Sequence, residues 1–70
     1  MNVIAENILA IINERGLKHV AVAKKAGYSR QQFSYMIHGR KAIGPTDILR
    51  IANALDVTPN DLFGIKSERA

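Results

Sequence analysis

Apolar side chains recur every three or four residues along two long stretches of the chain. Between residues 3 and 15 four isoleucines recur at this spacing, namely Ile4, Ile8, Ile11 and Ile12. A second stretch, opening at Pro45, repeats the spacing with Ile48, Ile51, Ala52 and Leu55, and Leu49 lies off this stripe. A period of 3.6 residues collects such positions on one face of a helix. Both stretches therefore predict amphipathic helices with one buried face.

The ends of these helices are marked by residues that satisfy free backbone groups. Asn2 can cap the first helix, and Gly16 ends it in the left-handed conformation that glycine adopts most readily. Gly44 and Pro45 open the later helix, with proline at its first position. Thr58 caps a short closing helix that carries Leu62 and Phe63 and ends at Gly64.

Two short helices joined by a tight turn are predicted in the middle of the chain. The first spans about residues 19–26 and ends at Gly27. The second begins after Ser29, whose hydroxyl can cap it, and Gln32 three residues later completes a capping box.

The second of these helices has two unlike faces. Phe33, Met36 and Ile37 form an apolar face by their spacing. The opposite face is polar and free of acids, and it carries Gln31, Ser34, Tyr35 and His38. A helix held by its apolar back, with hydrogen-bonding groups in front, suits the major groove of DNA.

The order of small, glycine, capping and apolar residues in this region resembles that of one known family. It is similar to the helix-turn-helix domain of phage repressor and Cro-type regulators, the XRE-type family, at Val22, Ala23, Gly27, Ser29, Phe33, Met36 and Gly39. The later run through Phe63 matches the closing helices of that family, so the resemblance covers roughly residues 4–64. It implies an all-α, compact five-helix domain of the lambda repressor-like type over residues 1–64, followed by a loose tail at 65–70.

The resemblance also implies a function. We expect sequence-specific binding of double-stranded DNA by a transcriptional regulator that acts at an operator. We expect a homodimer on DNA and a monomer when free, with the contact formed by Val57, Phe63 and Ile65. Seventy residues leave no room for a ligand-sensing domain, so a short Cro-like regulator of the cytoplasm is expected, with no cofactor and no small-molecule ligand.

The distribution of charge supports a polyanionic partner. No Asp or Glu occurs from Arg15 to Thr46, and this window holds seven basic residues: Arg15, Lys18, Lys24, Lys25, Arg30, Arg40 and Lys41. The net charge of +4 therefore divides into +7 in the window and −3 outside it. A basic patch alone also describes an ordinary solvated surface, but its coincidence with the helix-turn-helix pattern favours DNA.

We expect the bases to be read from the second helix of the motif, by Arg30, Gln31, Gln32, Ser34 and Tyr35. Gln31 points outward, and glutamine pairs bidentately with adenine. Arg30 suits either a guanine or a phosphate, and Tyr35 suits either a thymine methyl or the edge of the core. The sequence does not choose between the two roles of Arg30, whereas for Tyr35 a DNA contact is favoured.

We expect phosphates to be bound by Lys18, His19, His38, Arg40 and Lys41. Lys18 precedes a helix whose free N–H groups favour an anion, although it equally suits an ordinary surface lysine. His19 is expected to offer its backbone N–H, and His38 suits either a DNA contact or a polar helix end. Arg40 and Lys41 lie in the loop after Gly39, where Ala42 and Ile43 are expected to pack on the core.

The chain departs from the family at one internal pair. Many members carry an arginine in the first helix and a glutamate at the end of the recognition helix. The corresponding residues here are Ile12 and Ile37. We expect both to be buried and in contact, since packed apolar groups often replace a buried ion pair without loss of stability.

Other classes of function find little support. The chain has no cysteine, no long apolar run, no signal peptide and no recognisable catalytic set, and a metal site at the two histidines lacks further ligands. RNA is disfavoured because the major groove of A-form RNA is too narrow for a reading helix. An antitoxin-like or other protein-interaction module on the same fold is the alternative.

Overall fold

The polypeptide forms five helices in the order that the sequence predicts. The computed structural model describes residues 2–65, with α1 at Val3–Arg15, α2 at His19–Ala26, α3 at Arg30–Ile37, α4 at Pro45–Leu55 and α5 at Pro59–Phe63. Within these residues no strand occurs, so the all-α prediction is confirmed. Apart from Ile65, the predicted loose tail lies outside the described residues.

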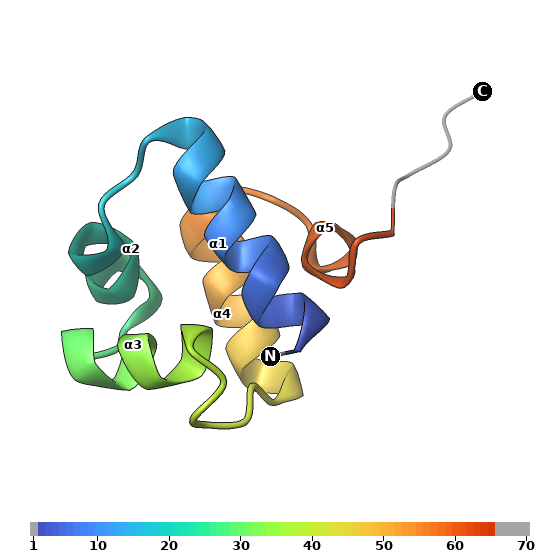
Figure 1. The fold of residues 1–70 in the computed structure, drawn as a ribbon. Coiled ribbons are helices and arrows are strands. Elements are labelled where there is room, and N and C mark those ends of the chain that lie inside the picture. The colour runs from blue at the N-terminus through green and yellow to red at the C-terminus, as the bar shows by residue number, and fades with distance from the viewer. Residues whose placement is uncertain (1, 66–70) are drawn as a thin grey trace.

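Helix α3 is supported from behind by the rest of the fold. Helices α1 and α4 occupy the middle of Figure 1, with α2 and α3 on one side of them and α5 on the other. Helix α1 packs against α3 and α5, while α4 packs against α2 and α5, and α2 packs against α3. One side of α3 is therefore left for solvent.

The predicted helix ends are confirmed in detail. Asn2 Oδ1 accepts a hydrogen bond from Ala5 N at 2.7 Å. The backbone of Gly16 adopts φ 64°, and that of Gly27 adopts φ 88°. Thr58 caps α5 and shares a capping box with Asp61. Each of these ends depends on neighbours within a few residues, so the local sequence determines it.

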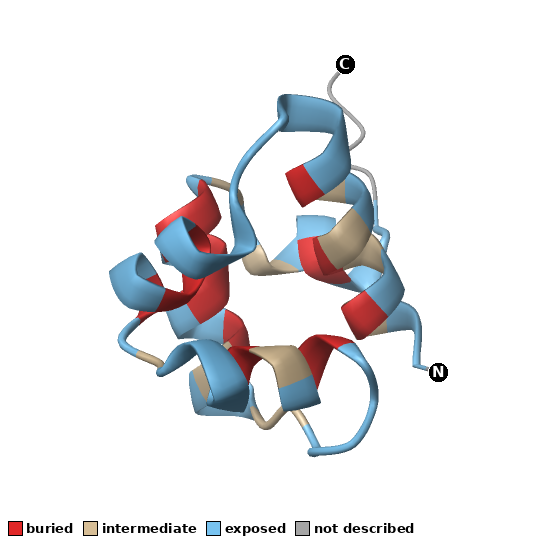
Figure 2. Ribbon diagram, turned by 60° about the vertical axis from the view of Figure 1, so that its left-hand side comes forward, coloured by how far each residue is buried: buried red, intermediate tan, exposed pale blue. Residues whose placement is uncertain are grey.

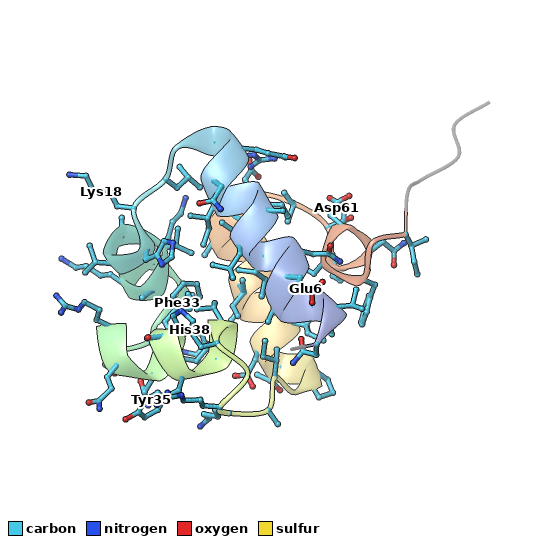
Figure 3. The ribbon with its side chains drawn as sticks, viewed as in Figure 1. Glu6, Lys18, Phe33, Tyr35, His38 and Asp61 are labelled. Carbon is cyan, nitrogen blue, oxygen red and sulfur yellow. The ribbon has the colours of Figure 1, made fainter. Side chains whose placement is uncertain are left out.

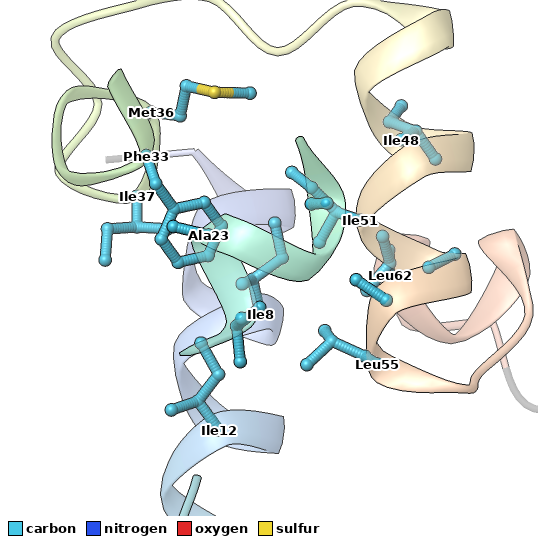
Figure 4. Packing of buried hydrophobic residues seen from close by; sticks show 14 residues of the cluster. Ile8, Ile12, Ala23, Phe33, Met36, Ile37, Ile48, Ile51, Leu55 and Leu62 are labelled. Atoms are coloured by element: carbon cyan, nitrogen blue, oxygen red, sulfur yellow. The ribbon is translucent and has the colours of Figure 1, made fainter. Parts of the chain in front are cut away.

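A single apolar core joins all five helices. Figure 2 shows buried positions on the inward sides of the helices, and Figure 4 shows their side chains converging. The largest fully buried side chains are Ile8, Ile12, Phe33, Met36, Ile37, Ile51 and Leu62. Ile12 and Ile37 are each 1% exposed and belong to the same buried cluster, which confirms the burial predicted for both.

Polar side chains of α1 bind the last carbonyls of two other helices. Arg15 Nη1 donates to Leu55 O at 2.6 Å, at the end of α4. Asn7 Nδ2 donates to Leu62 O at 2.8 Å, near the end of α5. Helix ends leave such carbonyls without intrahelical donors, so both bonds satisfy groups that would otherwise need water. Arg15, counted in the basic window, is thus engaged within the fold.

Two smaller expectations have different outcomes. Ile43 packs against the core as predicted, but Ala42 is exposed, so its predicted packing is wrong. A methyl group gains little from burial, and the loop turns there after Lys41. Leu49, off the α4 stripe, is 60% exposed.

Among the described residues no helix is long and apolar enough to cross a membrane.

Candidate nucleic-acid interface

The turn between α2 and α3 is built from backbone hydrogen bonds. Gly27 N donates to Lys24 O at 3.1 Å and Tyr28 N donates to Ala23 O at 2.9 Å, which closes the end of α2. Gln32 N then donates to Ser29 Oγ at 3.1 Å, and Ser29 N donates to Gln32 Oε1 at 2.9 Å. This is the predicted capping box, and it fixes the direction in which α3 leaves the turn.

Arg50 of α4 holds this turn from the inner side, a role that the sequence analysis missed. Its Nε donates to Ala26 O at 3.0 Å and its Nη2 donates to Gly27 O at 2.9 Å. Its guanidinium carbon lies 4.3 Å from the centroid of the Tyr28 ring. A cation is favoured both at a helix C-terminus and over an aromatic face. Arg50 therefore fixes the end of α2 relative to α4.

Asp47 ties the same turn to the beginning of α4. Tyr28 Oη donates to Asp47 Oδ1 at 2.5 Å, and Gly44 N donates to Asp47 Oδ2 at 2.9 Å. The bond from Tyr28 and that from Gly44 hold the pKa of Asp47 below its usual value. Burial and the neighbouring carboxylate raise the pKa of Tyr28 to about 12. Near neutral pH Tyr28 therefore keeps its proton and Asp47 is ionised, and these are the forms that make this hydrogen bond.

Replacing Tyr28 by phenylalanine should make stability less dependent on pH at both extremes. The folded protein holds the Tyr28 proton more tightly than the unfolded chain does. The resulting contribution to the free energy of unfolding is complete below pH 10 and is lost towards pH 12. The contribution of Asp47 is complete above its ordinary value of 3.8 and is lost as the pH falls below it. Denaturant unfolding of both proteins across this range measures the difference. Parallel stability curves would contradict the prediction.

The side of α3 that points away from the core carries most of the residues predicted to read bases. Arg30, Gln31, Gln32 and Tyr35 are exposed, with Tyr35 at 41%, and Ser34 is half-buried. In Figure 3, Phe33 lies on the side of α3 that faces the core, where it is buried. Tyr35 lies on the opposite side of the helix. The exposure of Tyr35 is compatible with a DNA contact. For Gln32, the capping box already occupies the side-chain oxygen.

The polar groups on this surface are linked in pairs one helical turn apart. Gln31 Nε2 donates to Tyr35 Oη at 2.9 Å. His38 Nδ1 lies 2.7 Å from Ser34 O and 3.3 Å from Ser34 Oγ. A shallow depression of about 480 Å³ lies beside them, lined by Ser34, Tyr35, His38 and Arg40. The side chains are therefore partly oriented before any ligand arrives.

The candidate phosphate-binding residues lie at the start of α2 and just beyond α3. Lys18, His19, His38, Arg40 and Lys41 are all exposed. Lys18 supplies no side-chain hydrogen bond to the start of α2. The backbone nitrogens of Arg40 and Lys41 donate to Tyr35 O at 2.8 and 3.2 Å, which fastens the loop to the end of α3.

Several charges of opposite sign lie apart in the fold (Figure 3), although Asp47 lies against the turn between α2 and α3. In Figure 3, Lys18, Tyr35 and His38 lie on the side of α2 and α3, whereas Glu6 and Asp61 lie towards α5. Within residues 2–65 no group of three or more His, Cys, Asp or Glu side chains could hold a metal ion. The α2–α3 surface thus carries basic and uncharged polar side chains, including the hydrogen-bonding groups of α3.

Comparison with known proteins identifies the type of domain. A family model, that of the Cro/C1-type HTH DNA-binding domain, matches residues 7–68. The match includes α2, the turn and α3, and it covers nearly the whole chain. Proteins of this family are typically non-catalytic. No curated protein matches the chain significantly.

Proposed function

Because the chain belongs to the Cro/C1-type family of helix-turn-helix DNA-binding domains, we propose that it regulates transcription by occupying an operator. The observation that carries this proposal is the outer surface of α3, which is polar, free of acids and held from behind by a buried apolar face. The major groove admits such a helix and presents a distinct pattern of donors and acceptors for each base pair. Regulation would follow from occlusion or recruitment at a promoter, without chemistry.

Within this proposal the residues divide into two groups. Arg30, Gln31, Gln32, Ser34 and Tyr35 would face the bases, and Lys18, His19, His38, Arg40 and Lys41 would face phosphates. The position of the second group, at the start of α2 and just beyond α3, supports the division, because phosphate contacts set the position of a reading helix. Since Gln32 Oε1 already accepts one hydrogen bond in the capping box, its amide N–H groups would be the main groups available to a base.

Selection of bound fragments from random duplex DNA tests the proposal. A sequence-specific regulator should enrich a motif, and its affinity for that motif should fall steeply as salt is raised, because bound phosphates release counterions. Scrambled DNA of equal length is the control. Enrichment of no motif, or an affinity independent of salt, would refute the proposal.

An apolar groove formed by α4, α5 and the loop between α3 and α4 supports a protein contact as well. It is lined by Ile43, Pro45, Ile48, Leu49, Pro59 and Phe63, and its volume is about 470 Å³. Leu49 is 60% exposed and Phe63 44% exposed, whereas Val57 packs against the core. One recognition helix reads only a few base pairs, and helix-turn-helix dimers bind half-sites about 34 Å apart. We therefore propose that a second copy of this chain occupies the groove on DNA.

Replacing Leu49 by aspartate should abolish cooperative binding to an operator with two half-sites. A carboxylate in the contact would be desolvated without a partner, and typical coupling energies are about 1–3 kcal/mol. Affinity for a single half-site should stay unchanged. Ala10→Asp is the matched control, because it adds the same charge at an exposed position of α1 outside the groove. A footprint covering one half-site, with one chain per DNA, would contradict the dimer.

A further inference from the structure

The hydrogen bond between His38 and Ser34 fixes the position of a proton. His38 Nδ1 lies 2.7 Å from the backbone oxygen of Ser34. A carbonyl oxygen only accepts, so Nδ1 must carry the hydrogen and donate it. In the neutral ring, Nε2 is then without hydrogen and acts only as an acceptor. The exposed nitrogen of His38 can donate only when the ring is protonated and positively charged.

The surroundings of the ring favour an anion over a base. His38 is the C-cap of α3, beyond the helical turns that present Gln31 and Ser34. Besides His38 itself, the depression at this place is lined by Ser34, Tyr35 and Arg40, which brings one phenol and one guanidinium to the same depression as the ring. Helices α1 and α2, which pack against α3, contribute no side chain to this lining.

We propose that His38 binds a DNA phosphate as an imidazolium, so that DNA binding is accompanied by uptake of a proton at this ring. A phosphate oxygen only accepts, and the bare Nε2 of the neutral ring also only accepts, so the neutral ring cannot make this contact while Nδ1 donates to the Ser34 carbonyl. Histidine is the side chain whose charge ordinarily changes between pH 5 and 8. Affinity for DNA therefore rises as the pH falls through this range. The inference rests on the proposed DNA binding.

A contact to a base would have the opposite signature. The bare Nε2 could accept a hydrogen bond from the amino group of adenine or cytosine, and protonation would then abolish the contact. Affinity would fall at low pH and would depend on sequence. A phosphate contact is independent of sequence, so a duplex of mixed sequence is a sufficient probe.

The experiment measures binding of this duplex at about pH 5.5, 6.5, 7.5 and 8.5, at constant low ionic strength. For the wild-type protein we expect the affinity to change by up to about tenfold per pH unit within part of this range, the limit for one proton. Calorimetry in two buffers of different ionisation enthalpy should detect the proton taken up. His38→Gln keeps a donor that does not titrate, so its affinity should be nearly independent of pH.

His19→Gln is the matched control, because it removes the other histidine of the candidate interface. We expect this variant to retain the pH dependence of the wild-type protein, since His19 is assigned a backbone contact. An equal pH dependence in wild type and His38→Gln, or an affinity that rises with pH, would overturn the inference alone. Failure of the wild-type protein to bind duplex DNA at any of these pH values would refute the proposed function and the inference together.

Discussion

Replacing Ile37 by glutamate should destabilise the fold by more than about 3 kcal/mol. The side chain of Ile37 is 1% exposed and lies in a cluster with Ile12, Phe33 and Met36. A carboxylate there would either lose its hydration without a partner or take up a proton at a cost in free energy. A domain of this size is only marginally stable, so much of the protein should be unfolded at room temperature. Denaturant unfolding monitored by circular dichroism measures the change.

Two further variants separate charge from packing. Ile37→Val removes one methylene group and should cost only about 0.5–1.5 kcal/mol. The double variant Ile12→Arg with Ile37→Glu restores the ion pair carried by many relatives, and it should recover part of the stability lost in Ile37→Glu. Recovery requires that the two positions interact, as a double-mutant cycle would show. A stability of Ile37→Glu within about 1 kcal/mol of wild type would contradict the prediction.

The architecture could be predicted because its signals are local. The end of α2 at Gly27 and the beginning of α3 at Ser29 each depend on residues at most five positions apart. The buried faces follow from the period of the apolar residues, which also placed Ile12 and Ile37 inside. Local propensity, capping and apolar pattern agree at most helix ends, with the uncapped start of α2 at Lys18 as an exception, and such agreement is what makes one fold predictable.

The contacts that orient the motif could not be predicted, because they join distant residues. Arg50 and the carbonyl of Ala26 are 24 positions apart, and Tyr28 and Asp47 are 19 apart. The sequence analysis gave no role to Asp47 or to Arg50. A list of basic residues likewise cannot reveal that Arg15 binds the end of α4. Only packing of the helices brings these groups together.

The outward direction of the candidate site residues could be predicted, but their pairing was missed. Gln31 and Tyr35, like Ser34 and His38, are four positions apart in or at the end of one helix. Residues at this separation are neighbours on a helical surface, so the signal for both pairs was available. The pairing matters for function because a side chain oriented in advance loses less entropy on binding.

Gln31→Ala should cost about 1–3 kcal/mol on the best operator and relax the preference at one base pair. Gln31 Nε2 donates one hydrogen to Tyr35 Oη, which leaves a second N–H and Oε1 for the edge of an adenine. The loss on scrambled DNA should be small, because that DNA offers no matched adenine. Tyr35→Phe should cost part of the same affinity for the operator in the wild-type protein. The same substitution should cost less in the Gln31→Ala variant, where the Tyr35 hydroxyl no longer orients Gln31.

Lys41→Ala is the matched comparison, since it removes a side chain expected to bind a phosphate. Lys41 is exposed in the loop that the Tyr35 carbonyl holds at the end of α3. Its loss should weaken binding to operator and scrambled DNA alike and lower the salt slope by about one. Titration of both variants on both DNAs at several salt concentrations separates the roles. An equal loss on both DNAs for Gln31→Ala would mean a backbone contact, and an unchanged salt slope for Lys41→Ala would mean a lysine that binds no phosphate.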